Sequence, residues 1–288
     1  MGIFKDKAIQ QEFDTKGFVC LPALNAEQIE EITRLYSEVK PKSNPGIYSN
    51  VQDQPKELNR KIADTIKGAF SEFIATHFQE VQIAGCSYLV KQSGEGSQSE
   101  MHQDYTLVEE DKFTSLSIWC PMCDVDENNG CLQVINGSHK WFSALRSVNI
   151  PSLYLGFEEQ LTRHLTPVAV KAGTAVLYAH NLFHGSKPNL SSEIRISSTI
   201  SIAPKQAKLS HFFKQKDHIL QVEIDEDFYY TTMPIYRSEG RLVDIKPIQK
   251  LPLTLVNEVS NEKFYETAKV EHKTSSDLLG YLKRLFGK

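Results

Sequence analysis

The spacing of hydrophobic residues changes about one third of the way along the chain. Up to about residue 80, hydrophobic side chains recur every three or four positions, which predicts amphipathic helices near 9–13, 26–39 and 55–78. Asn25 is a suitable N-cap for the second of these helices. Residues 17–22 instead form a strand-like run that stops at a proline.

The middle third of the chain has the pattern of a β-protein. Short runs rich in β-branched and aromatic residues predict strands at 86–90, 115–120, 132–135, 167–170, 175–178 and 194–202. Asn129-Gly130 is a strong signal for a tight hairpin turn. Many short strands after helices predict a mostly β fold, in which an antiparallel double sheet, or jelly roll, is buttressed by the N-terminal helices.

These patterns predict one domain over residues 1–250. We expect a helical buttress over about 1–80, a jelly-roll core over about 81–205 and a lid that forms part of a pocket over about 206–250. Residues 251–288 are expected to be a C-terminal extension with an amphipathic helix, since its leucines from Leu278 to Leu285 share one helical face. Packing on its own domain or in a dimer is favoured over binding to a membrane surface or another partner.

The composition indicates a soluble globular protein. Hydrophobic residues make up 40% and charged residues 24% of the 288 residues. The net charge of -4 argues against nucleic acid as a main partner, because phosphate binding needs a basic surface. We find no signal peptide and no apolar run long enough for a transmembrane segment. A cytoplasmic protein with a small-molecule substrate is therefore expected.

The cysteine residues predict no disulfide framework. Their number is odd, at 5, which suggests reduced thiols. Cys120 and Cys123 form a C-x-x-C pair, and Cys131 follows eight residues later. A zinc site needs a fourth soft ligand at a matching spacing, and a thioredoxin-like site needs a βαβ context. Neither stands out, so we interpret these cysteines as small apolar strand residues.

Candidate metal ligands lie in the middle third. His102 and Asp104 are two positions apart, so in an extended strand they project to the same face. His184 follows later, and His180 is an alternative third ligand. Two imidazoles and one carboxylate on one face of an Fe(II) ion form the facial triad of oxygenases, which leaves room for a bidentate 2-oxo acid and O2. Alone, H-x-D is a weak signal, and a surface histidine with a strand aspartate is the plain alternative.

Arg195 is a candidate for binding the co-substrate. It lies eleven residues after His184, in a run of apolar and hydroxyl-bearing residues. An arginine there is costly to bury unless an anion pairs with it, and the distal carboxylate of 2-oxoglutarate matches its guanidinium fork. Ser197 lies on the same face and adds a hydroxyl group. An internal ion pair with an Asp or Glu is the alternative.

From about residue 10 to residue 203 the chain resembles the phytanoyl-CoA dioxygenase family of Fe(II)- and 2-oxoglutarate-dependent oxygenases. Three blocks carry this resemblance, in the expected order: His102-Gln103-Asp104; Trp119 to Asp124 with Asn129-Gly130 and Gly137-Ser138-His139; and Gly173 through His184 to Arg195. Two positions depart from the family pattern, Thr174 after Gly173 and Asn136 before Gly137. Both are expected to lie in turns, with no effect on a metal site.

The resemblance implies a double-stranded β-helix with iron at His102, Asp104 and His184. It also implies that Lys91 and Trp119 help Arg195 and Ser197 to form the 2-oxoglutarate pocket. Lys91 as a solvated lysine and Trp119 as a core residue are the alternatives. The implied reaction is hydroxylation of an unactivated C–H bond of a small organic substrate by O2, with release of succinate and CO2. Related halogenases lack the carboxylate that Asp104 supplies here.

Two other function classes are open at this point. A cupin-like enzyme that needs no 2-oxo acid explains the triad but leaves Arg195 and Trp119 without a role. A non-catalytic metal-binding protein conflicts with an intact triad, because a protein that loses turnover usually loses a ligand first. We therefore expect a dioxygenase, whose substrate the sequence does not indicate, because the family acts on thioesters, amino acids, osmolytes and natural products.

Overall fold

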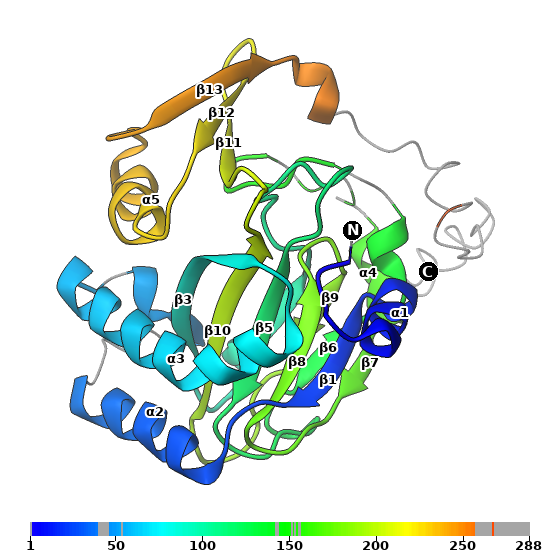
Figure 1. Ribbon diagram of the computed structural model, residues 1–288, viewed down its shortest axis with the longest axis vertical. Coiled ribbons are helices and arrows are strands. Elements are labelled where there is room, and N and C mark those ends of the chain that lie inside the picture. Colours follow the sequence, from blue (N-terminus) through cyan, green and yellow to red (C-terminus); the bar gives the residue numbers. More distant parts are fainter. Residues whose placement is uncertain are drawn as a thin grey trace, which may run out of the picture.

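The computed structural model describes residues 2–39, 46–52, 54–141, 144–150, 152, 154, 157–256 and 267. Its centre consists of two antiparallel sheets (Figure 1). The larger sheet has the order β1 (Phe18–Pro22), β8 (Thr174–Ala179), β5 (Leu116–Pro121), β10 (Arg195–Pro204), β3 (Val81–Lys91), β2 (Ile47–Ser49). The smaller sheet has the order β4 (Ser99–His102), β9 (His184–Ser186), β6 (Leu132–Val134), β7 (Thr166–Val168). This arrangement confirms the predicted jelly roll.

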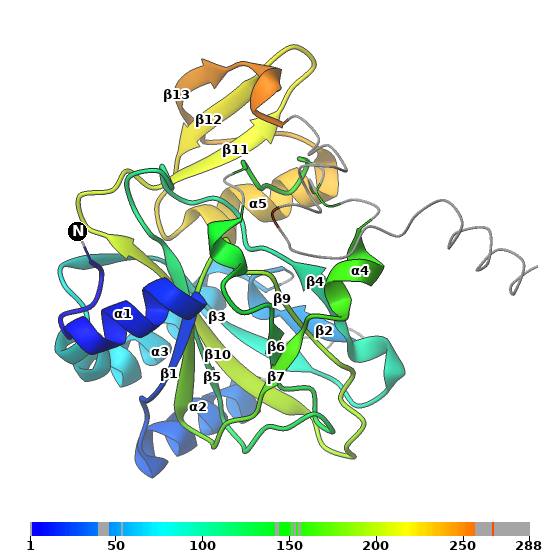
Figure 2. The ribbon, with the colours of Figure 1, turned by 90° about the vertical axis from the view of Figure 1, so that its right-hand side faces the viewer.

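Helices cover one side of the larger sheet (Figure 2). They are α1 (Lys7–Lys16), α2 (Ala26–Val39) and α3 (Lys56–His77). Asn25 and Gln28 cap α2 reciprocally, because each side-chain oxygen accepts the backbone N–H of the other residue. The buried face of α3 includes Ile62, Ile66 and Phe70, whose complete burial stabilises the fold by about 1.5–3 kcal/mol each. Shorter helices lie between the strands or, in the case of η4, after the last strand: α4 (Glu158–Thr162), η1 (Asn50–Gln52), η2 (Glu95–Ser97), η3 (Ser138–Lys140) and η4 (Leu253–Val256).

Two details differ from the sequence-based expectation. The strand expected at residues 17–22 is present as β1, which pairs with β8, but the helical region also contributes β2, a strand that was not predicted and that pairs with β3. The prediction of a tight hairpin at Asn129-Gly130 is wrong, because the flanking strands β5 and β6 belong to different sheets. The segment is instead a turn in which the Asp126 carboxylate accepts the backbone N–H groups of residues 128 and 129.

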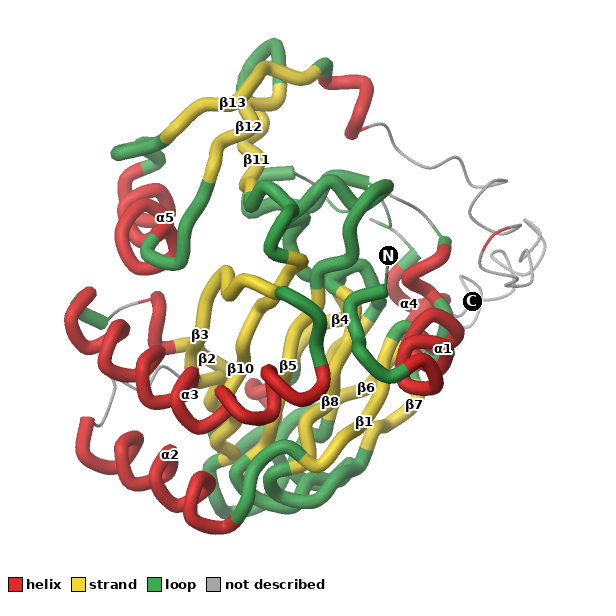
Figure 3. The backbone as a smooth tube through the Cα atoms, in the orientation of Figure 1, coloured by secondary structure: helices red, strands yellow, loops and turns green. Residues whose placement is uncertain are grey.

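A small subdomain stands at one end of the jelly roll (Figure 3). It consists of a three-stranded antiparallel sheet, β11 (Ser210–Lys214), β12 (Ile219–Glu223) and β13 (Lys246–Leu251), together with helix α5 (Phe228–Glu239). We call these four elements the cap. It occupies the segment expected to form the lid.

A second hydrophobic cluster packs Phe213, Val222, Phe228 and Met233 of the cap against Ala84 of β3 and Ala203 of β10. Ion pairs also join the cap to α3, since Asp227 lies 3.1 Å from Lys56 and Glu226 lies 2.8 Å from Lys67. The amphipathic helix expected in residues 251–288 lies outside the described residues. In the described part of the chain, no helix is both long and apolar enough to cross a membrane.

Candidate active site

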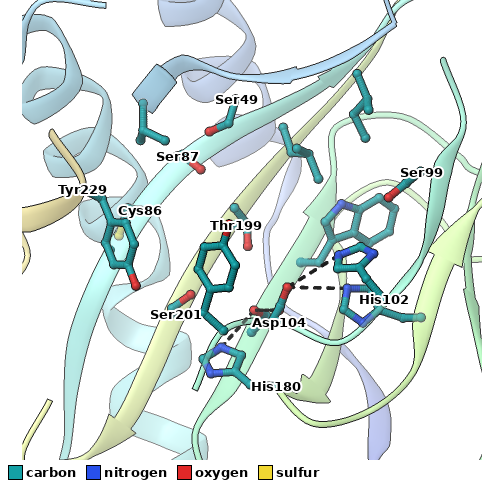
Figure 4. Close-up of a pocket in the computed structure, with 18 of the residues that line it drawn as sticks. Ser49, Cys86, Ser87, Ser99, His102, Asp104, His180, Thr199, Ser201 and Tyr229 are labelled. Atoms are coloured by element: carbon teal, nitrogen blue, oxygen red, sulfur yellow. Dashed lines mark hydrogen bonds and ion pairs between the residues drawn. The ribbon is translucent and has the colours of Figure 1, made fainter. Parts of the chain in front are cut away.

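Pairing of β4 with β9 brings the predicted metal ligands together. His102, the last residue of β4, lies directly opposite His184, the first residue of β9. Asp104 follows two residues after the end of β4, and its Oδ1 atom lies 3.8 Å from His102 Nε2 and 3.7 Å from His184 Nε2 (Figure 4). One ligand atom from each of the three residues lies within 4.8 Å of the other two. Such a cluster has the donor set and spacing to hold one metal ion.

Backbone carbonyl groups orient both imidazoles toward this point. His102 Nδ1 lies 2.7 Å from the Glu100 carbonyl oxygen, and His184 Nδ1 lies 3.0 Å from that of Leu182. A carbonyl oxygen only accepts hydrogen bonds, so both Nδ1 atoms carry the proton and both Nε2 lone pairs are free for a metal. Burial, with the nearby His102, lowers the pKa of His184 to about 4. His184 is therefore neutral at pH 7, as metal ligation requires.

Asp104 is held as a carboxylate. Its Oδ2 atom accepts a 3.0 Å hydrogen bond from the Ser117 hydroxyl, which leaves Oδ1 facing the two histidines. Burial alone would raise the pKa of Asp104, but the neighbouring histidines, with His184 foremost, and the Ser117 hydroxyl outweigh it and lower this pKa. An ionised carboxylate is the form that binds a cation.

His180, the alternative third ligand, lies outside the cluster. It is buried, with Nδ1 2.8 Å from the Ser115 hydroxyl and Nε2 3.1 Å from the Ser117 hydroxyl. Both of its nitrogens are thus engaged with hydroxyl groups. The structure groups His184, and not His180, with His102 and Asp104.

Arg195 and Lys91 form a buried pair of cations. They lie directly opposite each other on β10 and β3, and their exposed fractions are 1% and 0%. The Arg195 guanidinium stacks over the Trp119 ring, 5.1 Å from its centroid, and donates to the Gly130 carbonyl. Lys91 Nζ lies 2.6 Å from the Ser186 hydroxyl. Burial, with the nearby Arg195, lowers the pKa of Lys91 to about 7.

No carboxylate of the described chain pairs with either cation, and Arg195 Nε has no hydrogen-bond partner there. The internal ion pair considered for Arg195 is thus not found among the described residues. Two adjacent buried positive charges are costly, and a bound anion offsets that cost. Only glycine fits at position 130, because a Cβ atom there would lie 2.6 Å from the Lys187 carbonyl oxygen and 2.9 Å from Lys91 Cδ.

The remaining two candidate residues differ in their access to ligands. Trp119 is fully buried, and it lines the same cavity as Arg195 and the metal cluster. The Ser197 hydroxyl donates a 2.7 Å hydrogen bond to the Leu89 carbonyl oxygen. Its proton is therefore engaged, and it offers a ligand at most an acceptor lone pair.

A cavity of about 370 Å³ joins the metal cluster to Trp119 and Arg195, whereas Lys91 and Ser197 are not among the residues that line it. It extends from His102, Asp104 and His184 along the inner face of the larger sheet to the cap. Residues that sequence reasoning did not assign to it include Ser49, Ser87, Tyr105, Thr199, Ser201, Tyr229 and Arg237. The cluster of aromatic residues around Tyr229 was visible in the sequence, but its place over the sheet follows only from the folded cap.

Comparison with known proteins agrees with this site. The profile of the family described as phytanoyl-CoA dioxygenase (PhyH) matches residues 13–197. The chain belongs to the phytanoyl-CoA dioxygenase family. The resemblance inferred from the sequence blocks is thereby confirmed.

The chain is similar to curated members of this phytanoyl-CoA dioxygenase family over part of its length. It is 29% identical to phytanoyl-CoA dioxygenase 1 of Oryza sativa subsp. japonica over 125 residues, which cover 42% of this chain and 44% of that protein. It is 32% identical to phytanoyl-CoA dioxygenase domain-containing protein 1 of Danio rerio over 123 residues, which cover 40% and 42%. The match thus spans less than half the length of these relatives.

Solved structures share the fold. The non-heme alpha ketoglutarate dependent carbocyclase SnoK from nogalamycin biosynthesis superposes with a TM-score of 0.52 at 16% identity, over 71% of this chain and 86% of SnoK. The epimerase SnoN, solved with Fe3+, alpha ketoglutarate and nogalamycin RO, gives a TM-score of 0.50 at 16% identity, over 70% of this chain and 86% of SnoN. At this identity the likeness establishes the jelly-roll fold.

Proposed function

We propose that this protein is an Fe(II)- and 2-oxoglutarate-dependent dioxygenase that hydroxylates an unactivated C–H bond of a small organic substrate and releases succinate and CO2. One observation carries the proposal. The cavity that contains the His102, Asp104 and His184 ligand atoms also contains Arg195, a buried cation without a carboxylate partner among the described residues.

The residues present fit both implied groups. Two neutral imidazoles and one carboxylate are the donor set that non-heme Fe(II) oxygenases use, and they leave neighbouring coordination positions open. A dicarboxylate such as 2-oxoglutarate supplies the anion that Arg195 lacks. A cupin-like enzyme without a 2-oxo acid, or a protein that only binds metal, leaves Arg195 without an anionic partner.

Each residue then has a separate task. Bound iron, with 2-oxoglutarate and O2, supplies the oxidising chemistry that removes hydrogen from an unactivated carbon. His102, Asp104 and His184 would hold the metal, and the Arg195 guanidinium would bind the far carboxylate of the co-substrate. Trp119 fixes the guanidinium plane and excludes water from it.

Metal binding tests the ligand assignment. Calorimetric titration with Fe(II) under anaerobic conditions should show tight binding to the wild type, loss of binding in His184→Ala, and binding in His180→Ala. Normal affinity in His184→Ala with loss in His180→Ala would contradict the assignment.

Succinate release tests the co-substrate and the reaction. Wild-type protein with Fe(II), 2-oxoglutarate, ascorbate and O2 should release succinate slowly, and a true substrate should accelerate this release. Product made under labelled O2 should carry one oxygen atom from O2. Metal binding without succinate under any condition would favour the non-catalytic alternative.

A further inference from the structure

The cavity holds more positive charge than the proposed reaction uses. Of the described residues that line it, Asp104 is the one carboxylate, and it faces the histidine cluster. Two arginines line the same cavity, Arg195 from β10 and Arg237 from α5. The proposed co-substrate accounts for Arg195. Arg237 is left without an anion.

The Arg237 guanidinium is available to a ligand. Arg237 is solvent-exposed in the last turn of α5, and within the described chain it forms neither an ion pair nor a side-chain hydrogen bond. Arg241, four residues further on, pairs instead with Glu239. A cation in the last turn also stabilises a helix, but that role does not require the side chain to line a cavity.

Part of the cavity wall between Arg237 and the metal ligands carries hydroxyl groups, although apolar side chains such as Leu89, Leu107 and Trp119 also line the cavity. Side chains with hydroxyl groups line it, and none of these hydroxyls bonds to another residue in the described ranges: Ser49, Ser87, Tyr105, Thr199, Ser201 and Tyr229. Figure 4 shows several of them around one space, with Tyr229 reaching in from the cap side. Ser49 Oγ is buried and unpartnered. A ligand that forms hydrogen bonds can pair with these hydroxyl groups, and an acyl chain cannot.

The volume of the cavity also limits the size of the substrate. Small-molecule pockets typically enclose about 300–1,000 Å³. This cavity of about 370 Å³ must hold both 2-oxoglutarate and the substrate. The substrate portion inside it is therefore small.

From these observations, and resting on the proposed function, we infer that Arg237 forms the anion subsite of the substrate pocket and that the substrate is a small polar carboxylate. Its carboxylate binds Arg237 at the cap, its polar groups meet the sheet hydroxyls and Tyr229, and its reacting carbon points toward the metal cluster. Arg237 and Tyr229 lie beyond residue 197, where the family match ends. The subsite is thus built by the part of the chain outside that match.

Paired compounds test this inference. Wild-type protein saturated with Fe(II) and 2-oxoglutarate is assayed for succinate release with small aliphatic, hydroxy and amino carboxylates, each compared with its own primary carboxamide. The carboxylates should stimulate release more than their amides. With the best carboxylate, Arg237→Ala should raise KM on the order of 10- to 100-fold, as loss of a hydrogen bond to a charged group does. Arg237→Lys should recover part of this loss, because it keeps the charge without the fork.

Arg241→Ala is the matched control, because Arg241 lies in the same region but does not line the cavity. It should keep the wild-type KM. The inference is overturned if the carboxylates as a group stimulate no more than their amides, including the case in which neither does, or if Arg237→Ala keeps the wild-type KM. Failure of the proposed function has a different signature, since wild-type protein would then lack Fe(II) binding or turnover of 2-oxoglutarate altogether.

Discussion

Ser117 donates a hydrogen bond to Oδ2 of Asp104, and this contact fixes the direction of a longer chain of hydrogen bonds. Since the Ser117 proton is used on Asp104, the same hydroxyl accepts from His180 Nε2 at 3.1 Å. His180 is buried, which lowers its pKa and favours the neutral ring, so its Nδ1 accepts from the Ser115 hydroxyl at 2.8 Å. Every donor thus points toward Asp104, and each bond polarises the next.

Removal of the Ser117 hydroxyl should weaken metal binding. In Ser117→Ala, Oδ2 of Asp104 loses this hydrogen bond, so the carboxylate is held less firmly toward the histidines. Loss of such an outer contact typically costs about 10- to 100-fold in metal affinity. Anaerobic calorimetry with Fe(II) measures this change. Ser198→Ala is the control, because the buried Ser198 hydroxyl has no hydrogen-bond partner in the described structure. Equal affinities in the two variants would contradict the role of Ser117.

Replacement of Arg195 should affect the co-substrate. A buried bidentate charge pair that loses one partner costs about 2–5 kcal/mol, so the apparent KM for 2-oxoglutarate should rise at least about 30-fold in Arg195→Ala. Arg195→Lys should recover only part of this loss, because a lysine lacks the planar fork. Fe(II) affinity measured in parallel shows whether the variant is folded. Unchanged affinity of Arg195→Ala for 2-oxoglutarate would rule out its assignment.

The candidate metal site could be predicted because its signals are local. The two-residue spacing of His102 and Asp104 limits where their side chains point, and the surrounding blocks identify His184 by resemblance. The adjacency of Lys91 and Arg195, in contrast, depends on the register of β3 against β10, more than 100 residues apart in the chain. No local pattern sets that register.

The cap was predicted only as a lid segment. Its strands are short, and β13 is mostly exposed, so their hydrophobic pattern is weak. Helix α5 contains Pro234, which normally argues against a helix interior. Packing of Phe228 and Met233 against the small sheet overrides this local preference. Arg237 therefore reaches the cavity through tertiary contacts that the sequence alone does not reveal.

Stability should depend on pH through Lys91. Burial lowers the pKa of Lys91 from 10.5 to about 7 in the folded protein. Between these values the unfolded chain binds a proton that the folded chain lacks, so this residue makes the free energy of unfolding rise with pH across that window. Lys91→Met should lack this contribution. Urea denaturation without metal or 2-oxoglutarate, at several pH values from 7 to 10, measures the difference between the two proteins.

The difference between wild type and Lys91→Met should shift in favour of the wild type as pH rises. Lys205→Met is the control, since Lys205 is exposed and forms no ion pair in the described chain, and its difference from wild type should stay constant. Parallel curves for wild type and Lys91→Met would show that Lys91 is not titrating in this range.

Asp227 links the cap to α3. Its carboxylate lies 3.1 Å from Lys56 Nζ and also accepts from the Arg60 guanidinium, while its side chain remains 31% exposed. Partly exposed ion pairs are worth about 0.2–1 kcal/mol each and weaken in salt. The pairs therefore contribute modestly to global stability, and their effect is concentrated where the cap meets the helices.

Asp227→Asn removes both ion pairs with almost no change in shape, so it should loosen the cap without unfolding the jelly roll. We expect the free energy of unfolding to fall by at most about 1–2 kcal/mol at low salt, and by less at high salt. Hydrogen–deuterium exchange should speed up in α5 and β11–β13 while the amides of β3 and β10 keep their protection, because the core strands pair independently of Asp227. Asp217→Asn is the control, since among the described residues the ion pair of that exposed side chain is with the adjacent His218. Faster exchange in β3 and β10 as well as in the cap would mean that the two parts unfold as one unit. No change in the cap would mean that the ion pairs of Asp227 do not hold it.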